Sequence, residues 1–326
     1  MYLGVDGGGT KTALCLLRED GRVAAEALAP SCYYFADGIG LVGRVLRQGI
    51  DEVCQKASVT PADVRYAFFG LPTYGEVSGD VPALDAAPGA ILGHDRYACD
   101  NDTVCGWSGS LGGIDGINVV SGTGSITYGE RAGNGVRVGG WGELFGDEGS
   151  AYWIAIKALN AFSRMGDGRL PVGPLHKTLR AHLALEADLD LVDVILNRWQ
   201  GERREIAALS QVVSGAAEEG DECAAQILSG AAEELADLVD TTRRLLDFGP
   251  EEEIPVSYSG GVFNARPVVE GFEAALGQRH DGYELRKPLF SPVLGAAIYA
   301  AKLAGEPLEV EAIDPSEAAR QDRDTR

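Results

Sequence analysis

The sequence has few of the residues that build metal and disulfide sites. Its six cysteines are scattered and form no CxxC pair, so neither a zinc knuckle nor a thioredoxin-like motif is expected. Only four histidines occur, which disfavours a histidine-rich metal centre. No run of 18 or more apolar residues is present, so we expect no membrane-spanning helix. The opening MYLGVDGGGT lacks the basic and apolar segments of a signal peptide, and we expect a reduced, cytoplasmic protein.

Positive charge is also scarce, since 28 lysines and arginines stand against 49 aspartates and glutamates and leave a net charge of −21. A surface this acidic repels phosphate backbones and anionic lipids, so nucleic acid and membranes are poor partners. ATP is not excluded, because backbone amides and a metal ion can hold its phosphates locally. The length of 326 residues and the 45% content of hydrophobic residues suit a globular protein of about two domains.

Hydrophobic runs and turn residues predict an α/β protein in which a similar order of elements occurs twice. The predicted strands lie at 2–5, 12–17, 22–28, 65–69, 95–99, 116–120, 126–129, 136–138 and 254–258. The predicted helices lie at 40–56, 266–276 and 292–303, with a long helical stretch at about 147–248 that breaks near 166–171. We therefore expect one domain at 1–110 and another at 111–326. The small residues of the last helix, at about 291–304, also suit close packing against the first domain.

A glycine-rich turn, DGGGTKT, joins the first two predicted strands and is called here the first glycine turn (residues 6–12). Glycine lets the backbone approach a phosphate closely, and successive amides together with the Thr10 hydroxyl can donate to it. Asp6, at the strand end, is placed to hold a magnesium ion through water. The turn is not a P-loop, because GxxxxGK[ST] is absent, and not a Rossmann fingerprint, because a strand follows it. The alternative is a glycine-rich hairpin without a ligand.

The second glycine turn (residues 121–125), SGTGS, also lies between two predicted strands. Alone it would be an ordinary β-turn, but as a pair the two turns indicate a nucleotide held from two sides. Asp102 lies between them in the sequence, at a strand end, where a carboxylate could orient a hydroxyl and accept its proton during phosphoryl transfer. The alternative for this stretch is a helix N-cap, a role that Asp100 or Asn101 could also serve.

The densest glycine run, GGWGELFGDEGS, is called here the GGWG loop (residues 139–150) and is unusual for a plain connection. Its backbone at 140–142 could line a polar ligand, Trp141 could stack on a sugar face, and Asp147 could bind hydroxyls or assist the metal. The alternative is a rigid loop in which Asp147 caps the next helix. The late glycine turn (residues 259–264), SGGVFN, could lie against adenine and ribose.

These motifs resemble those of the BadF/BadG/BcrA/BcrD ATPase family and, within it, the N-acetylglucosamine kinases. LGVDGGGTKT and SGTGS are similar to the two phosphate motifs, SGGVFN to the adenosine motif, and SPVLGAAIYA at 291–300 to the closing helix. The segment GGWGELFGDEGSAYW at 139–153 is the most specific likeness. The resemblance covers about residues 3–303. It implies the two-domain, actin-like ATPase (ribonuclease H-like) fold of actin, hexokinases and heat-shock chaperones, with a cleft between the domains.

The resemblance also implies roles for individual positions. Asp102 matches the catalytic base, which also contacts the sugar. Nucleotide contacts are expected at Gly8, Gly9, Thr10, Lys11, Thr123, Ala207, Gly260 and Gly261. Sugar contacts are expected at Ser125, Ile126, Gly140, Trp141, Gly142 and Asp147. ATP and Mg²⁺ are the implied cofactors, and a homodimer that closes on its sugar by domain rotation is the implied assembly.

One position departs from the family pattern. Related sugar kinases place an asparagine just after the third strand to bind sugar hydroxyls, whereas this sequence has no asparagine there and Cys32 or Tyr33 takes its place. An amide both donates and accepts hydrogen bonds, so its loss could change which hydroxyls are read.

The expected reaction is transfer of the ATP γ-phosphate to an amino sugar, with the 6-hydroxyl of N-acetylglucosamine favoured. Glucosamine and N-acetylmuramic acid are alternatives, and the second would need a cation for its lactyl carboxylate, for which the motif loops offer only Lys11. Another alternative is an ATP-driven activator of an acyl-CoA dehydratase or reductase, whose iron–sulfur cluster would need cysteines such as Cys99 and Cys105. The last alternative is a sugar sensor that binds without catalysis.

Overall fold

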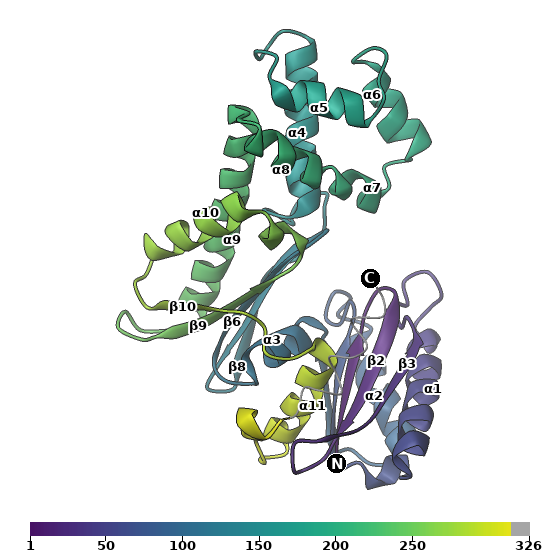
Figure 1. The fold of residues 1–326 in the computed structure, drawn as a ribbon. Coiled ribbons are helices and arrows are strands. Elements are labelled where there is room, and N and C mark those ends of the chain that lie inside the picture. Colours follow the sequence, from purple (N-terminus) through teal and green to yellow (C-terminus); the bar gives the residue numbers. More distant parts are fainter. Residues whose placement is uncertain (314–326) are drawn as a thin grey trace. The chain divides into compact units, whose positions relative to one another are not determined.

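The computed structural model describes residues 1–313, which form two compact units. Unit 1 comprises Met1–Asp115 and residues 288–313, and unit 2 comprises Gly116–Lys287. The sequence predicts one division near residue 110, whereas the chain passes between the units twice, after Asp115 and after Lys287. The end of the predicted second domain, 314–326, lies outside the described residues. The α/β class is confirmed, since each unit is built on a five-stranded sheet (Figure 1).

The sheet of unit 1 begins with an antiparallel meander, as the three opening apolar runs predict. Its strands are β1 (Tyr2–Gly7), β2 (Lys11–Leu17), β3 (Val23–Pro30), β4 (Tyr66–Leu71) and β5 (Tyr97–Asn101), in the order β3-β2-β1-β4-β5. β4 is parallel to β1 and β5 is parallel to β4, so their carboxyl ends meet at one edge. At this edge Asp6 pairs with Gly70, and Gly70 pairs with Asp100. Acidic residues far apart in the sequence therefore share one end of the sheet.

Helices cover the sheet of unit 1. They are α1 (Gly40–Ala57), α2 (Val81–Leu92), α3 (Thr103–Leu111) and α11 (Pro292–Leu303), with short 3₁₀ turns η1 (Pro61–Asp63) and η4 (Val310–Ala312). α1 buries the face that its periodicity predicts, with Val45, Leu46 and Ile50 in the core of this unit.

The last helix, α11, belongs to unit 1 because small residues let its backbone approach β1 and α3. A Cβ on Gly4 of β1 would lie 2.2 Å from the Ala297 nitrogen. A Cβ on Gly295 would lie 2.1 Å from the Gly109 nitrogen of α3. Neither side could carry a larger residue without moving the backbone of its neighbour, so these glycines set the position of α11.

The sheet of unit 2 repeats the plan of the first. Its strands are β6 (Gly116–Ser121), β7 (Ser125–Arg131), β8 (Asn134–Gly139), β9 (Ile254–Ser259) and β10 (Tyr283–Arg286), in the order β10-β9-β6-β7-β8. β6, β7 and β8 form the antiparallel meander, and β9 and β10 add in parallel. The sequence analysis missed β10, because its four residues, YELR, contain no apolar run and form the edge of the sheet.

The long helical stretch of unit 2 is interrupted more often than its sequence predicts. Its helices are α4 (Ala151–Gly166), α5 (Pro174–His182), α6 (Asp190–Val192), α7 (Arg203–Ala208), α8 (Ser210–Glu218) and α9 (Glu222–Leu245), with the π-helical turn η2 (Asp193–Arg198). After β9, the 3₁₀ turn η3 (Gly261–Asn264) leads to α10 (Arg266–Gly277), where the sequence predicts a separate helix. Asp221 marks one of these breaks, since its carboxylate accepts hydrogen bonds from the backbone of Ala224 and of Leu175, both at 2.8 Å. One buried carboxylate thus starts α9 and ties it to α5.

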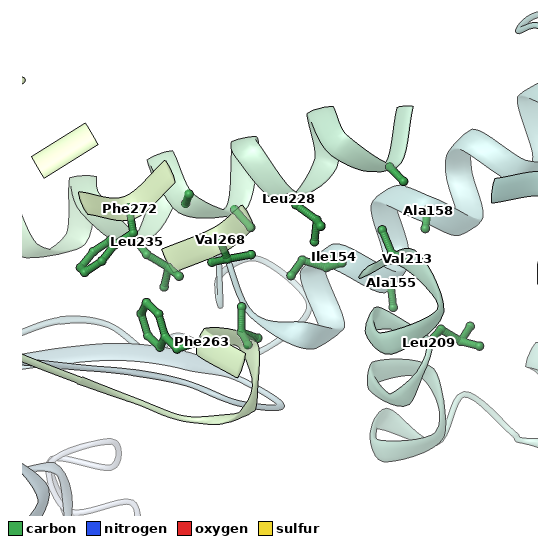
Figure 2. Close-up of a cluster of buried hydrophobic side chains, with 14 of the residues drawn as sticks. Ile154, Ala155, Ala158, Leu209, Val213, Leu228, Leu235, Phe263, Val268 and Phe272 are labelled. Atoms are coloured by element: carbon green, nitrogen blue, oxygen red, sulfur yellow. The ribbon is translucent and has the colours of Figure 1, made fainter. Parts of the chain in front are cut away.

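The core of unit 2 joins four of these elements. Ile154 of α4, Leu228 of α9, Phe263 of η3 and Val268 of α10 point toward one another in Figure 2 and belong to one buried cluster. This packing places the late glycine turn, through Phe263, beside the first turns of α4 and α10. Among residues 1–313, no helix is both long and apolar enough to cross a membrane.

Candidate functional site

The first glycine turn closes the β1–β2 hairpin and presents its tip to solvent. The Gly8 N–H donates to the Lys11 carbonyl at 2.8 Å, and the Ser31 hydroxyl donates to the Gly8 carbonyl at 2.8 Å. Gly9 and Thr10 are exposed, and a Cβ on Gly9 would meet no other atom within 4 Å. The base of the turn is therefore fixed while its tip stays open to a ligand that accepts from backbone amides.

Two carboxylates lie together beside this turn. Asp6 ends β1, and Asp102 precedes α3 directly after β5. Burial and the negative charge of Asp102 raise the pKa of the Asp6 carboxyl to about 7, against the opposing effects of Lys11 and a hydrogen bond from Cys105. A divalent cation would relieve this repulsion by favouring both charges.

This edge of the sheet fits a magnesium ion better than a fully protein-bound metal. Carboxylate oxygens are the ligands that Mg²⁺ takes, and it retains water and phosphate oxygens in its remaining positions. Across the described chain, no three side chains of histidine, cysteine, aspartate or glutamate gather as a metal-binding group. The Asp6 carboxylate would hold the ion, directly or through water, and the phosphates of the nucleotide would complete its ligands.

The start of α3 is served by the side chain of Asn101, one of the residues that the sequence offers for this role, and not by that of Asp102. Asp102 occupies the N-cap position of α3, but its side chain makes no capping hydrogen bond. The side-chain amide oxygen of Asn101, Oδ1, instead accepts from the backbone N–H and the hydroxyl of Thr103, at 3.2 and 2.9 Å. Because Asn101 serves the start of the helix, the Asp102 carboxylate is not needed for it.

The cysteines near this edge do not suit an iron–sulfur cluster. Cys105 is completely buried, and its Sγ lies 3.5 Å from the Val5 carbonyl oxygen. Burial raises the pKa of Cys105 well above its usual value, and burial also raises that of Cys99. The cluster ligand is the thiolate, which such surroundings disfavour.

At the position where related kinases carry an asparagine, Tyr33 and not Cys32 is accessible. Cys32 is 1% exposed, and a Cβ on Gly7 would lie 2.7 Å from its sulfur. Tyr33 is 42% exposed, and its ring centroid lies 5.3 Å from that of Phe35. An aromatic pair therefore stands where an amide was expected.

In unit 2, the second glycine turn is tied to the start of α4. The Ala151 N–H donates to the Gly122 carbonyl at 2.9 Å, and the Ser121 hydroxyl donates to the Gly149 carbonyl at 3.0 Å. The late glycine turn packs against the same turn, since a Cβ on Gly260 would lie 2.2 Å from the Ser121 carbonyl oxygen. β6 and β9 are parallel neighbours, so both turns lie at the same edge of the sheet. Three of the predicted motifs thus meet within unit 2.

The GGWG loop follows β8 and ends at α4, where Ser150 and not Asp147 is the N-cap residue. The Ser150 hydroxyl accepts from the Trp153 backbone at 3.1 Å. Asp147 has a left-handed φ of 57° and is 3% exposed, so its carboxylate turns inward and cannot reach the first amides of the helix. The alternative role of Asp147 as a helix cap is therefore wrong.

The Asp147 carboxylate is held by several donors. It forms an ion pair with Arg203 and accepts backbone hydrogen bonds from Ser125 and Gly142. Burial raises the pKa of Asp147, while Arg203 and these hydrogen bonds oppose the rise. Sequence reasoning missed Arg203, because it lies 56 residues from Asp147 and no local pattern marks it.

The remaining predicted sugar contacts lie around this carboxylate or at the tip of the loop. A Cβ on Gly140 would lie 2.4 Å from Ile126 Cδ1, so these two residues touch. The Ser125 hydroxyl donates to the Glu148 carbonyl at 2.6 Å. Trp141 is 72% exposed and projects from the loop.

A cavity of about 320 Å³ opens beside the late glycine turn. Its walls come from α4, α8, α9, η3 and α10 of unit 2, and the lining residues include Gln211, Ser214, Leu228, Gly261 and Val268. Its volume lies at the lower end of the range for small-molecule sites. Ala207 does not line it and is buried in α7. Of these two predicted nucleotide contacts, Gly261 therefore lies at the cavity and Ala207 does not.

The family model for the BadF/BadG/BcrA/BcrD ATPase family matches residues 3–300, which is most of the chain. The chain belongs to this ATPase family. The family expected from the glycine turns and the GGWG loop is thereby confirmed. As a member of this ATPase family, the protein uses ATP.

Known relatives of this family member include sugar kinases. An N-acetyl-D-glucosamine kinase of Dictyostelium discoideum is 29% identical over 315 residues, covering 92% of this chain and 97% of the relative. An N-acetylmuramic acid/N-acetylglucosamine kinase of Clostridium acetobutylicum is 31% identical over 264 residues, covering 80% and 85%. A solved structure assigned as an N-acetylglucosamine kinase from Chromobacterium violaceum has a TM-score of 0.66 at 25% identity, covering 93% and 98%. The ROK hexokinase of Thermus thermophilus shares the fold, with a TM-score of 0.60 at 16% identity, covering 92% and 98%.

Proposed function

We propose that this ATPase-family member is an ATP-dependent kinase of an amino sugar and that it phosphorylates the 6-hydroxyl of N-acetylglucosamine. The observation that carries the proposal is the Asp6–Asp102 carboxylate pair beside the first glycine turn. Such a pair offers one carboxylate for a cation on the phosphates and one for the accepting hydroxyl. The names of both curated relatives support an amino sugar as the acceptor.

In the proposed reaction, Asp102 orients the sugar hydroxyl and accepts its proton. The hydroxyl oxygen forms a bond to the γ-phosphorus as the bond from that phosphorus to the β,γ-bridging oxygen breaks, and ADP leaves. Asp6 holds Mg²⁺, which neutralises charge on the phosphates when it is bound. Backbone amides of the first and second glycine turns, with Thr10 and Thr123, bind the phosphates.

We assign the nucleotide base to the cavity beside the late glycine turn. Gly261 lines this cavity and follows Gly260 in the chain, and Leu228 and Val268 offer the apolar surface that a purine ring needs. Gln211 and Ser214 are the polar groups that could distinguish one base from another. Ala207 would act indirectly, through the position of α7.

We assign the sugar to the GGWG loop. Its contacts would come from Ser125, Ile126, Gly140, Trp141 and Gly142, and the Asp147 carboxylate would accept from a sugar hydroxyl. N-acetylmuramic acid is the second candidate, because one relative carries it in its name. Arg203 is a cation near the loop, but Asp147 and Glu143 already neutralise it. The neutral sugar is therefore favoured over the acid.

The deciding experiment is a coupled assay of ADP release with Mg-ATP and four sugars: N-acetylglucosamine, glucosamine, N-acetylmuramic acid and glucose. We expect N-acetylglucosamine to give the highest kcat/KM, with N-acetylmuramic acid at least tenfold lower because Asp147 and Glu143 already neutralise the Arg203 guanidinium beside the loop. Mass spectrometry of the product identifies the sugar phosphate. ATP binding without ADP release for any sugar would reject the kinase in favour of a sensor or an activator, and iron analysis would separate these two.

A homodimer and a cytoplasmic location complete the proposal. The homodimer rests on the family resemblance and the cytoplasmic location on the composition, and size-exclusion chromatography with light scattering measures the first directly.

A further inference from the structure

Arg203 is the first residue of α7 and reaches two acidic side chains of the GGWG loop. Its Nη2 donates to Asp147 Oδ2, and its Nε lies 3.4 Å from Glu143 Oε2. The Asp147 side chain is only 4% exposed, whereas those of Arg203 and Glu143 are 37% and 32% exposed. The guanidinium therefore bridges the buried base of the loop and its more open middle.

The same ion pair lies directly against the second glycine turn. A Cβ on Gly124 would lie 2.6 Å from Arg203 Nη2 and 2.8 Å from Asp147 Oδ2. Only a residue without a side chain leaves room for this contact. Three segments that are distant in the sequence, the second glycine turn, the GGWG loop and α7, thus converge on one guanidinium.

The other contacts of the loop tip are few. The Arg137 guanidinium donates to the Gly140 carbonyl, and the Asp147 carboxylate accepts from the Gly142 backbone. Trp141, Leu144 and Phe145 are 72%, 85% and 75% exposed and project from the loop. One backbone hydrogen bond, from the Gly146 N–H to the Gly142 carbonyl at 2.9 Å, closes the turn between them. A glycine-rich segment with these contacts keeps substantial conformational freedom unless it is anchored elsewhere.

We propose that Arg203 is a positioning residue that anchors the GGWG loop to the second glycine turn and thereby sets the sugar contacts relative to the phosphate contacts of unit 2. This inference rests on the proposed function for its catalytic consequence, but its structural part stands alone. Arg203 acts through Asp147, Glu143 and Gly124. Its planar fork can serve both carboxylates, which the single ammonium group of a lysine cannot do equally well.

The first measurement compares the sugar kinetics of Arg203→Ala, Arg203→Lys and Arg204→Ala. Arg204 is the matched control, since it is the next residue of α7, is exposed and is in none of the ion pairs found among residues 1–313. We expect Arg203→Ala to lower kcat/KM for the sugar roughly 10- to 100-fold, mostly through KM, because the contacts lose their alignment. Arg203→Lys should recover part of this loss, and Arg204→Ala should behave as the wild type.

The second measurement needs no activity. Chymotrypsin cuts after Trp141, Leu144 and Phe145 when the loop opens, and cuts after the exposed Tyr33 and Phe35 of unit 1 serve as an internal reference. We expect cutting within the loop, mapped by mass spectrometry, to be about tenfold faster in Arg203→Ala than in Arg204→Ala, relative to that reference.

Equal loop cutting in these two variants would overturn the proposal. Absence of sugar-stimulated ADP release by the wild-type protein would instead reject the proposed function, while the cutting rates would still test the anchor. If Arg203→Ala does not fold, Gly124→Ala provides the second variant, because its methyl group would push the ion pair away while leaving both charges in the chain. It should open the loop in the same way, and a protected loop in this variant would also overturn the proposal.

Discussion

Asp102 differs from a structural aspartate at the start of a helix, because Asn101 makes the hydrogen bonds that α3 needs there. We therefore expect Asp102→Asn to keep its fold and its ATP affinity while kcat falls by roughly 10²- to 10⁴-fold, the range for loss of a general base. Single-turnover phosphoryl transfer and nucleotide binding by calorimetry measure the two effects separately. Turnover within a fewfold of wild type would remove Asp102 from the role of base.

We expect Asp6 to make Mg²⁺ binding depend on pH near neutrality. Its pKa is raised from 3.8 to about 7 in the folded protein, so the folded state binds the proton more tightly than the unfolded state. This preference adds fully to the free energy of unfolding below pH 3.8 and is lost as the pH rises through 7. A cation binds the ionised form, so Mg²⁺ binding should strengthen over the same interval. The ionised fraction changes from about one tenth at pH 6 to about nine tenths at pH 8, which predicts roughly tenfold weaker Mg²⁺ binding at pH 6.

Isothermal titration of Mg²⁺ into the protein–ADP complex at both pH values measures this effect. Asp6→Asn is the control, because it keeps the shape of the site and the titration of the nucleotide while removing the carboxyl. An equal pH dependence in the variant and the wild type would show that the nucleotide and not Asp6 causes it.

At the scale of elements, glycines act differently in α1 and α11 although both helices carry them in their interior. A Cβ on Gly295 would lie 2.1 Å from the Gly109 nitrogen, whereas one on Gly43 of α1 would meet no other atom within 4 Å. We expect Gly295→Ala to lower the free energy of unfolding by about 3 kcal/mol or more, because backbone must move. Gly43→Ala should raise it by about 0.5–1 kcal/mol through helix propensity.

Urea denaturation of the two variants and the wild type measures both changes. Because both variants replace a helical glycine by alanine, the change in helix propensity is the same and the difference between them reports the backbone contact. A Gly295→Ala variant as stable as the wild type would mean that α11 can move away from α3 without loss.

The elements themselves show where sequence patterns are sufficient. The meander of unit 1 and the apolar face of α1 follow from alternation and helical periodicity, which depend only on neighbours in the chain. β10 was not predictable in this way, because an edge strand of four residues has little apolar pattern. The extra breaks between α4 and α9 depend on contacts such as those of Asp221, whose partners lie 46 and 3 residues away.

At the scale of the whole molecule, the net charge of −21 is the dominant long-range feature. Like charges repel one another in the compact state, and salt screens this repulsion over about 10 Å at 0.1 M. We expect the Tm to rise by a few degrees between 10 and 300 mM NaCl, as measured by scanning calorimetry, roughly as a stabilisation of about 1 kcal/mol would produce. Choline chloride should give the same rise, and a rise with NaCl alone would indicate a specific cation site instead of screening.

The sequence by itself determined the family, the α/β class, the glycine turns and the candidate base Asp102, because each of these depends on residues that are adjacent in the chain. The tertiary structure alone decided that the chain passes between the units a second time after Lys287 and that Arg203 meets the GGWG loop. The physical reason is the range of the interactions. Hydrogen bonding in turns and periodicity are local, whereas an ion pair between residues 147 and 203, or a glycine contact between residues 109 and 295, exists only after distant segments have packed.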